Sequence, residues 1–306
     1  MNEQQLFAYL GKQLEPDGDS ALAPLRLAPW KPETGPYHKV QFVIEIAGSN
    51  LIPGDRAREL LEPTVRASFG EPEVYVMAPG ERRWRPLWSG DNSMTFDSMA
   101  LAWDFVTSSG KLTAASASEL WKRAEQYASA LGRRAFPLPP PEDAARAADN
   151  LEQVRDALDI GVDILLRTLE PRLDLTALVV AAYEVGFRMG SSGVLEWRQS
   201  GWPEPLLTIL PDEGDEVFGV DAPIRGVDIG FTVPCSPDPE QSLERLFTAA
   251  ERIGAKMDLP VLTEEGEPLS ESAKNNIRKM LAAALDTFDR IQLKPGSAEA
   301  LRLFEP

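Results

Sequence analysis

The residues with the clearest potential for chemistry are few, because the chain has one histidine and one cysteine among its 306 residues. A Ser-His-Asp arrangement needs an imidazole base. His38, however, lies in a proline-rich stretch, and we interpret it as a surface or capping residue. Cys235 precedes an expected helix, whose N-terminus can lower a thiol pKa, but no dedicated base accompanies it. We interpret it as an inert small residue and expect a protein that is not an enzyme.

Motifs for phosphates and metals are also missing from the sequence. It contains no GxxxxGK[ST], GxGxxG, HExxH or CxxC pattern. Residues 211–221 carry several carboxylates, which hard cations prefer, but they lack the ligand spacing of an EF-hand. We interpret this stretch as a solvated acidic loop. We therefore expect no metal site and no cofactor.

Polar residues are expected on one face of a strand around residue 228. Successive side chains of a strand point to opposite faces. In the segment 226–234 this alternation sends Val227, Ile229, Phe231 and Val233 to one face, and it sends Asp228, Gly230 and Thr232 to the other. The same alternation places Arg167 on the outer face of its own strand. We expect Val227, Ile229 and Phe231 to form a core together with Leu246, Phe247 and Ile253 of the expected helix that follows.

Composition restricts the class of protein that carries these residues. Hydrophobic residues make up 43% and charged residues 26%, which is typical of a soluble globular protein. The formal net charge of −17 repels phosphate backbones and anionic lipid surfaces, so we expect no nucleic-acid partner. No apolar run approaches the roughly 20 residues needed to span a bilayer. With a single cysteine and no secretory signal, the chain is expected to be cytoplasmic and to have no membrane anchor.

The order of expected elements predicts two similar domains. Residues 1–39 are interpreted as a short amphipathic helix followed by a proline-rich arm, and residues 291–306 as a C-terminal tail. Between them, residues 40–159 and 160–290 both show the order β-α-β-β-β-α-β-α, which predicts an internal duplication and an α+β fold. The expected strands at 73–77 and 193–199 correspond in this scheme, as do the helix ends at Gly70 and Gly190 and at Gly132 and Gly254.

The second domain resembles a known family over residues 161–288. The residues that carry the likeness are Gly186-Phe187 at a helix end, Arg198 at a strand end, Gly226-Val227-Asp228-Ile229 and Val233-Pro234. In these it resembles the FtsZ-binding domain of the bacterial cell-division protein ZipA, with a weaker second copy at residues 40–158. The resemblance implies a mostly antiparallel sheet in each unit, with helices on one face and an apolar groove for the FtsZ tail on the other.

The expected binding face departs from that family, because its floor is polar. The resemblance aligns Leu195 and Trp197 with groove-lining positions. The resemblance also implies that the strands of Arg167 and Asp228 are neighbours in the sheet. Arg167 would then lie close to the polar floor formed by Asp228, Gly230 and Thr232. We therefore expect this face to hold a protein or peptide partner, or the chain's own arm at residues 24–36. In a purely structural interpretation, Arg167 and Asp228 form a cross-strand charge pair that contributes about 0.2–1 kcal/mol. Trp84, Trp88, Trp197 and Trp202 are then packing residues of the core or between the units.

Two functional hypotheses follow from these observations. The first is a non-enzymatic cytoplasmic protein-binding or scaffolding protein that uses an exposed sheet face or the cleft between two ZipA-like units. The alternative is a small-molecule-binding protein or enzyme with its site between the two units, where outer-face carboxylates act as acid and base.

Overall fold

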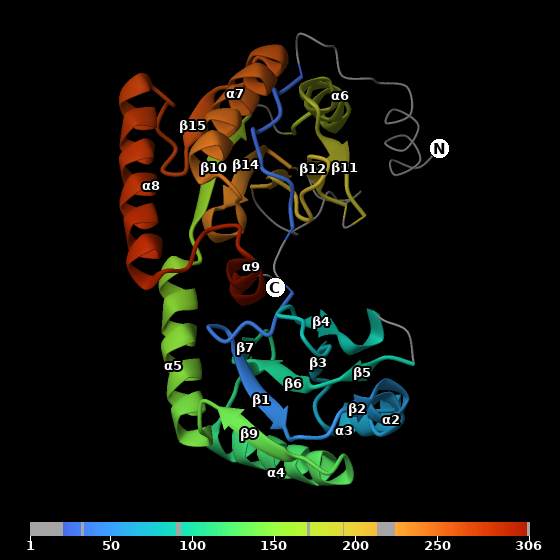
Figure 1. Cartoon of the computed structure of the whole chain (residues 1–306). Helices are drawn as coiled ribbons and strands as arrows, with labels where there is room; N and C mark the ends of the chain where they lie inside the picture. Colours follow the sequence, from blue (N-terminus) through green and yellow to red (C-terminus); the bar gives the residue numbers. More distant parts are fainter. Residues whose placement is uncertain are drawn as a thin grey trace. The chain divides into compact units, whose positions relative to one another are not determined.

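The computed structural model describes residues 21–31, 34–89, 93–169, 172–191, 193–212 and 224–304, and it has an α+β fold of antiparallel sheets and helices (Figure 1). The predicted α+β class is confirmed. The chain divides into two compact units. The N-terminal unit comprises the described residues within Pro32–Leu158 and Leu301–Pro306, and the C-terminal unit comprises those within Met1–Lys31 and Asp159–Ala300. Each unit is described by itself below.

The N-terminal unit is built on a five-stranded antiparallel sheet with the order β4-β3-β6-β1-β9. Its strands are β1 (Gln41–Ala47), β3 (Glu73–Met77), β4 (Arg85–Pro86), β6 (Ser98–Asp104) and β9 (Arg134–Leu138). Two short ribbons flank it, formed by β2 (Ile52–Pro53) with β5 (Thr95–Phe96) and by β7 (Val106–Thr107) with β8 (Gly110–Lys111). The helices are α2 (Gly54–Glu59), α3 (Pro63–Ser68), α4 (Ala114–Ala130) and α5 (Pro141–Leu158), with a short 3-10 helix η1 (Leu87–Ser89).

The core of this unit lies between the sheet and α4. Phe42, Ile44 and Ile46 alternate along β1 and are fully buried. The side of α4 that faces them is lined by alanines, whose small side chains let helix and sheet approach closely. Helices α2 and α3 are separated before Pro63, because proline cannot donate the amide hydrogen bond that a continuous helix requires.

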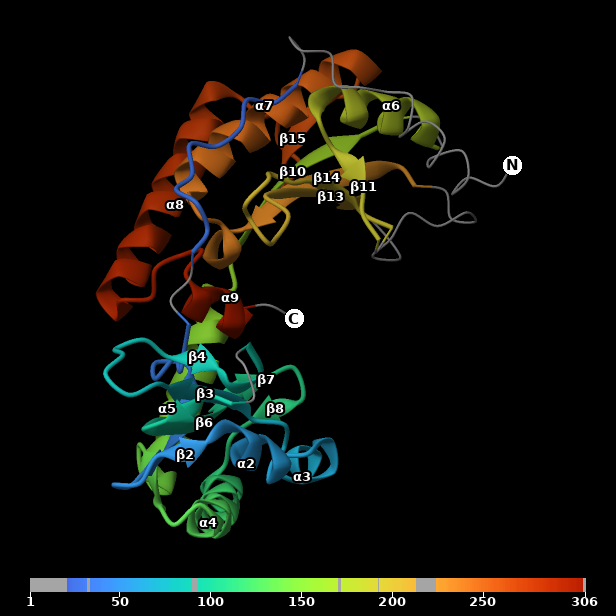
Figure 2. The same cartoon turned by 45° about the vertical axis from the view of Figure 1, so that its right-hand side comes forward.

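The C-terminal unit has a six-stranded antiparallel sheet with the order β11-β12-β13-β14-β10-β15. Its strands are β10 (Gly161–Arg167), β11 (Arg188–Met189), β12 (Leu195–Trp197), β13 (Leu207–Pro211), β14 (Gly226–Thr232) and β15 (Val261–Thr263). Its helices are α6 (Leu175–Val185), α7 (Pro239–Met257) and α8 (Glu271–Ile291), with a 3-10 helix η2 (Val233–Cys235). Helix α7 packs on β10, β14 and β15, and both α6 and α8 pack against α7 (Figure 2).

Burial confirms the strand phase that the sequence predicts for this unit. All six predicted core residues are buried, namely Val227, Ile229, Phe231, Leu246, Phe247 and Ile253. The first three point from β14 toward the helical side, and the last three lie on α7. Asp228 is half-buried and Thr232 is exposed on the opposite face, so the alternation of β14 is as expected.

Two glycines differ from their predicted roles as helix ends. Helix α6 ends at Gly186, not at Gly190. Gly186 has a φ of 112°, a left-handed conformation that glycine adopts without a steric penalty. Gly254 lies inside α7, which continues to Met257. Gly190 and Gly254 therefore do not correspond to Gly70 and Gly132, which directly follow helices and have φ values of 71° and 67°.

The two sheets share three strands in the same arrangement and differ at the next one. In both, the first strand lies between the strand that precedes the long helix and the strand that follows it: β6-β1-β9 in one unit and β14-β10-β15 in the other. Beside β6 lies β3, whereas beside β14 lies β13 and not β12. The expected correspondence of residues 73–77 with 193–199 is therefore wrong in sheet position. Strand β3 (73–77) lies next to β6, and β4 lies outside it, whereas β12 is separated from β14 by β13. The duplication of the whole domain stays a prediction.

Residues 21–31 of the arm lie on the helical side of the C-terminal unit. The Leu22 amide donates to the Val185 carbonyl at 2.9 Å, and Leu25 exchanges two hydrogen bonds with the Gln199 side chain, at 2.8 and 3.0 Å. The Trp30 ring meets Trp202 edge-on, with ring centroids 4.6 Å apart. Residues 24–31 therefore contact the helical side of this unit. The polar sheet face, which was expected to hold a partner or residues 24–36, lies on the opposite side. The expected helix near the N-terminus lies outside the described residues.

Candidate functional site

The candidate site is the face of the C-terminal sheet that points away from α7. It is formed by outward-pointing residues of β10, β13 and β14 and by the residue that follows β13. We call it the acidic sheet face and define it by Asp163, Arg167, Asp212, Asp228 and Gly230. The register brings these residues together, because Asp163 pairs with Gly230, Leu165 with Asp228, and Arg167 with Gly226.

Asp163 lies directly over the backbone of Gly230. A methyl group at Gly230 would come within 1.8 Å of the Asp163 Oδ1 atom, so only glycine leaves room for this carboxyl group. Desolvation by the sheet, together with the negative charges of Asp228 and Glu264, raises the pKa of Asp163 to about 6. The residue is nevertheless exposed at its outer edge, so solvent and ligands reach it. Asp163 therefore titrates close to neutral pH.

Asp212 is the deepest carboxylate of the acidic sheet face. Its side chain is 2% exposed, and its Oδ2 atom accepts hydrogen bonds from Arg167 at 2.8 Å (Nε) and 2.7 Å (a terminal nitrogen). Its Oδ1 atom is buried and has no hydrogen-bond partner among the described residues. Gly226 makes room for this group, since a methyl there would lie 2.4 Å from Asp212 Oδ2. A buried carboxylate oxygen without a donor is costly, and a cationic ligand group would relieve it.

Arg167 forms an ion pair with Asp212, and its charge also acts on Asp228, so the expected charge pair of Arg167 with Asp228 stays a prediction. Burial of Asp228 and the negative charge of Asp212 raise the pKa of Asp228, and the charge of Arg167 only partly opposes them. Asp212 lies in the stretch 211–221, for which the sequence predicts a solvated acidic loop and no site residue. Continuing the alternation of the preceding strand by one residue would have placed Asp212 on the same face as Thr208 and Leu210.

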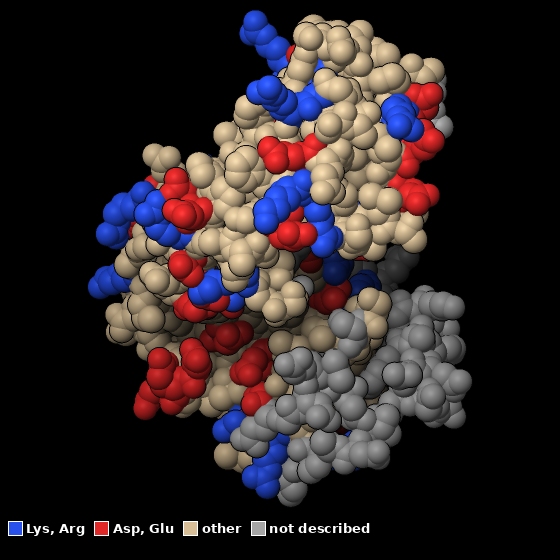
Figure 3. Space-filling model, turned by 90° about the horizontal axis from the view of Figure 1, so that it is seen from below, with Lys and Arg blue, Asp and Glu red and all other residues tan. Residues whose placement is uncertain are grey.

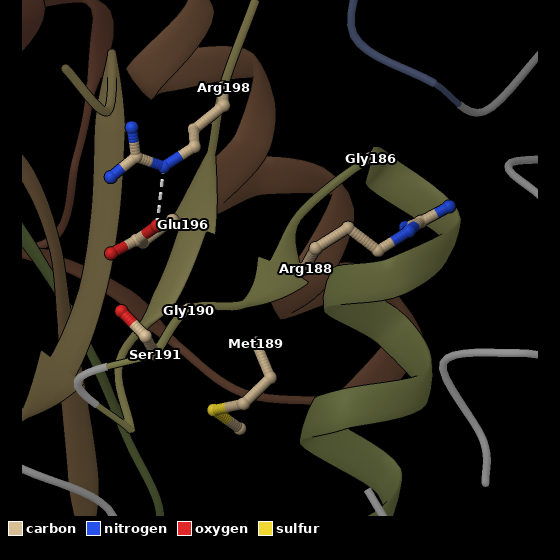
Figure 4. A pocket seen from close by; sticks show the side chains of 7 residues that line it. All are labelled: Gly186, Arg188, Met189, Gly190, Ser191, Glu196 and Arg198. Atoms are coloured by element: carbon tan, nitrogen blue, oxygen red, sulfur yellow. Dashed lines mark hydrogen bonds and ion pairs between the residues drawn. The ribbon is translucent and has the colours of Figure 1, made fainter. Parts of the chain in front are cut away.

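A pocket of about 410 Å³ lies at the β11–β12 edge of the same sheet (Figure 4). The register leads to it from Gly230 through Thr208 to Glu196. Glu196 accepts a hydrogen bond from Arg198 Nε at 2.6 Å, and the two side chains lie together in the figure. Arg188 points toward α6, where it donates to the carbonyls of Tyr183 and Phe187 at 2.9 and 2.6 Å. Both arginines therefore hold the local structure together.

Leu195 and Trp197 do not lie on the acidic sheet face. Both are buried on the helical side, where they pair with Ile209 and Leu207. A methyl group at Gly186 would lie 3.4 Å from the Trp197 ring, so the ring packs against the end of α6. The expected apolar wall beside the polar floor is thus wrong, because the register of β12 on β13 turns Glu196 outward. Of the remaining predicted residues, Gly230 lies beneath Asp163, and Thr232 is exposed at the strand end.

Other functional classes find no further support in the described parts of the chain. Within these ranges, no three His, Cys, Asp or Glu side chains are grouped in a way that could hold a metal ion. Among the helices of the described residues, none is long and apolar enough to cross a membrane. On the side of the molecule drawn in Figure 3, acidic and basic side chains lie beside one another in several places.

Comparisons with known proteins do not assign the chain to a group, since it matches no protein-family model and no curated protein.

Proposed function

We propose that the chain is a non-enzymatic, cytoplasmic protein-binding or scaffolding protein whose acidic sheet face holds a lysine- or arginine-bearing segment of another protein. The observation that carries this proposal is the buried carboxylate of Asp212, whose Oδ1 atom has no donor among the described residues. A cationic side chain is the group that best satisfies such an oxygen.

The charge balance of the face supports a basic ligand. Four carboxylates act on one another electrostatically across this face, namely Asp163, Asp212, Asp228 and Glu264. Arg167 brings a positive charge to them through its ion pair with Asp212. The pKa values of Asp163 and Asp228 are raised, by burial first and by neighbouring carboxylates second. A bound cation would lower both pKa values, and that change is equivalent to favourable binding energy at neutral pH.

The resemblance to the ZipA family supports binding of a peptide on a sheet face, and we propose two ZipA-like units on that basis. The acidic floor favours a basic segment in place of the apolar tail that the family binds. A role in bacterial cell division and the involvement of FtsZ rest on the resemblance alone.

A screen of displayed peptides against the full-length protein tests this function. We expect enrichment of peptides that contain lysine or arginine, with affinities that weaken as salt increases. Replacing Asp163 and Asp228 together by asparagine should weaken binding by about tenfold or more, since the loss of a charge contact that the ligand buries on binding typically costs more than 1.4 kcal/mol. Asp286→Asn, an exposed carboxyl on α8, is the matched control and should leave affinity unchanged. Peptides without charge preference, or equal binding by the double variant, would refute the proposal.

A further inference from the structure

The sheet of the N-terminal unit has a second face, which points away from α4 and carries its own buried cluster. Val43, Tyr75, Ala100 and Ala102 form this cluster, with Trp84 packed against it. The register places Val43 opposite Ala102 and Tyr75 opposite Ala100. A sheet with a core on one side has a second buried face only if something covers that face.

Trp84 packs against this cluster, and Gly35 lies next to the Tyr75 hydroxyl. The C-terminal helix α9 (Ala298–Phe304), whose residues 301–304 belong to this unit, reaches the same face through Arg302, which contacts Glu73 and Asp104. Figures 1 and 2 show it on the side of the N-terminal sheet opposite α4. Its apolar side chains Leu301, Leu303 and Phe304 are all buried. A segment seven residues long is too short to be a stable helix by itself, so its conformation depends on this docking.

Arg302 anchors α9 in a site built from several elements. Its guanidinium pairs with Asp104 at 3.1 Å and with Glu73 at 2.5 Å, and it lies over the Tyr37 ring, 5.0 Å from its centre. Gln41, which is itself buried, donates to Glu73 at 3.0 Å and to Asp104 at 3.1 Å. These bonds orient both carboxylates toward the guanidinium.

The electrostatics of Glu73 show that the site favours a cation. Burial alone would raise the pKa of Glu73, but hydrogen bonds from Arg302, Tyr75 and Gln41 outweigh it and lower the pKa. The pKa of Arg302 is raised, since its hydrogen bond to Glu73 and the charges of Glu73 and Asp104 overcome its own desolvation. A planar guanidinium suits two such carboxylates better than an ammonium does.

The face continues beyond α9 onto the edge strand β9. Leu138 pairs with Val43, and Phe136 pairs with Glu45, so both side chains point to this face. Phe136 is 48% and Leu138 40% exposed. Exposed apolar side chains beside an occupied docking site extend the surface available to a longer ligand.

We infer that this face is a receptor for an apolar segment bearing one arginine, and that Leu301–Phe304 is its tethered, displaceable occupant. A partner segment of the same chemistry would place its arginine between Glu73 and Asp104 and its apolar side chains over Val43 and Tyr75. Because a short tether gives the chain's own helix an effective concentration on the order of millimolar, a partner binds weakly until α9 is released. This inference concerns the other unit and does not rest on the acidic sheet face.

The test uses the full chain and a labelled peptide with the sequence of residues 297–304, SAEALRLF. Arg302→Ala weakens the chain's own helix, so this variant should bind the peptide at least about tenfold more tightly than the unsubstituted protein does. Adding Glu73→Gln and Asp104→Asn to that variant should abolish the gain, and replacing the peptide's arginine by glutamine should do the same. Arg290→Ala, an exposed arginine on α8, is the matched control and should leave binding unchanged.

Equal peptide binding by Arg302→Ala and the unsubstituted protein would overturn the inference and make α9 a permanent part of the fold. If Arg302→Ala does not fold, hydrogen exchange of the unsubstituted protein decides. Amides of α9 should exchange faster than those of β1 and β6, and faster still with excess peptide. Exchange of all three elements at one common rate would overturn the inference.

Discussion

At the scale of single residues, the acidic sheet face is defined by carboxyl groups that lie over glycines. Asp163 occupies the space above Gly230, and Asp212 that above Gly226. Asp163 and Asp228 are both close to sheet backbone and to other carboxylates, so burial and like charge both raise their pKa values. The ionised form of such a carboxyl group is destabilised. A bound cation would stabilise it, as expected for a surface that binds cationic ligands.

Asp163→Asn should change the pH dependence of stability. The folded pKa of Asp163, about 6, is above its usual value of 3.8, so its protonation favours the fold. That contribution is complete below pH 3.8 and is lost as the pH rises through 6. Above pH 6 the asparagine variant should be as stable as the unsubstituted protein or more stable, by less than about 1 kcal/mol because Asp163 is partly solvated. Urea unfolding of both proteins at pH 4.5, 6 and 8 measures the difference, and an identical difference at all three pH values would contradict it.

At the scale of elements, strand β12 shows how one register turns side chains inward or outward. Trp197 and Leu195 face the helices, while Glu196 between them faces the pocket and the acidic sheet face. The Trp197 ring meets the turn at Gly186, where α6 ends. Trp197 is therefore a packing residue between a strand and a helix end.

Trp197→Ala should destabilise the C-terminal unit without altering ligand contacts on the acidic sheet face. Removing a buried tryptophan typically costs about 3–5 kcal/mol through lost burial and the cavity left behind. Peptides selected on the acidic sheet face should still bind under conditions where the variant is folded. Trp88→Ala, at a residue that is 44% exposed in the other unit, is the comparison and should cost far less. Loss of peptide affinity with unchanged melting temperature would place Trp197 in the binding site instead.

At the scale of the whole molecule, each terminal segment belongs to the unit that is remote from it in sequence. Residues 21–31 lie on the C-terminal unit, and residues 301–304 lie on the N-terminal unit. The predicted boundaries at 39 and 290 treat both segments as appendages. In the structure they cover apolar surface, since Leu22, Leu25, Leu301 and Leu303 are all buried.

Leu25→Ala should therefore destabilise the C-terminal unit, although Leu25 lies before the first strand of the N-terminal one. Truncation of a buried leucine typically costs about 2–5 kcal/mol, with the lower end expected for a segment at the surface of a core. Hydrogen exchange should show lost protection in α6 and α7 and unchanged protection in β1 and β6. Leu51→Ala, at a residue that is 53% exposed, serves as the control. Loss of protection confined to β1 and β6 would contradict the assignment of the arm.

The sequence by itself determined the α+β class, most element positions and the faces of single strands. Val227, Ile229 and Phe231 alternate with Asp228 and Gly230, and period-two geometry alone decides which of them share a face. Helix ends were less secure. Gly186 and Gly190 are both plausible stops, and the choice depends on which one adopts a left-handed conformation.

Only the tertiary structure decided which faces and strands meet. The register of β12 on β13 separates Trp197 from Asp228, and the same sheet brings Asp212 to Arg167 across 45 residues. Likewise, Arg302 reaches Glu73 across 229 residues, and no local pattern announces that contact. Alternation and helical periodicity are set by the backbone of a few neighbouring residues, whereas strand order and terminal docking depend on packing between distant segments, which one sequence read locally does not specify.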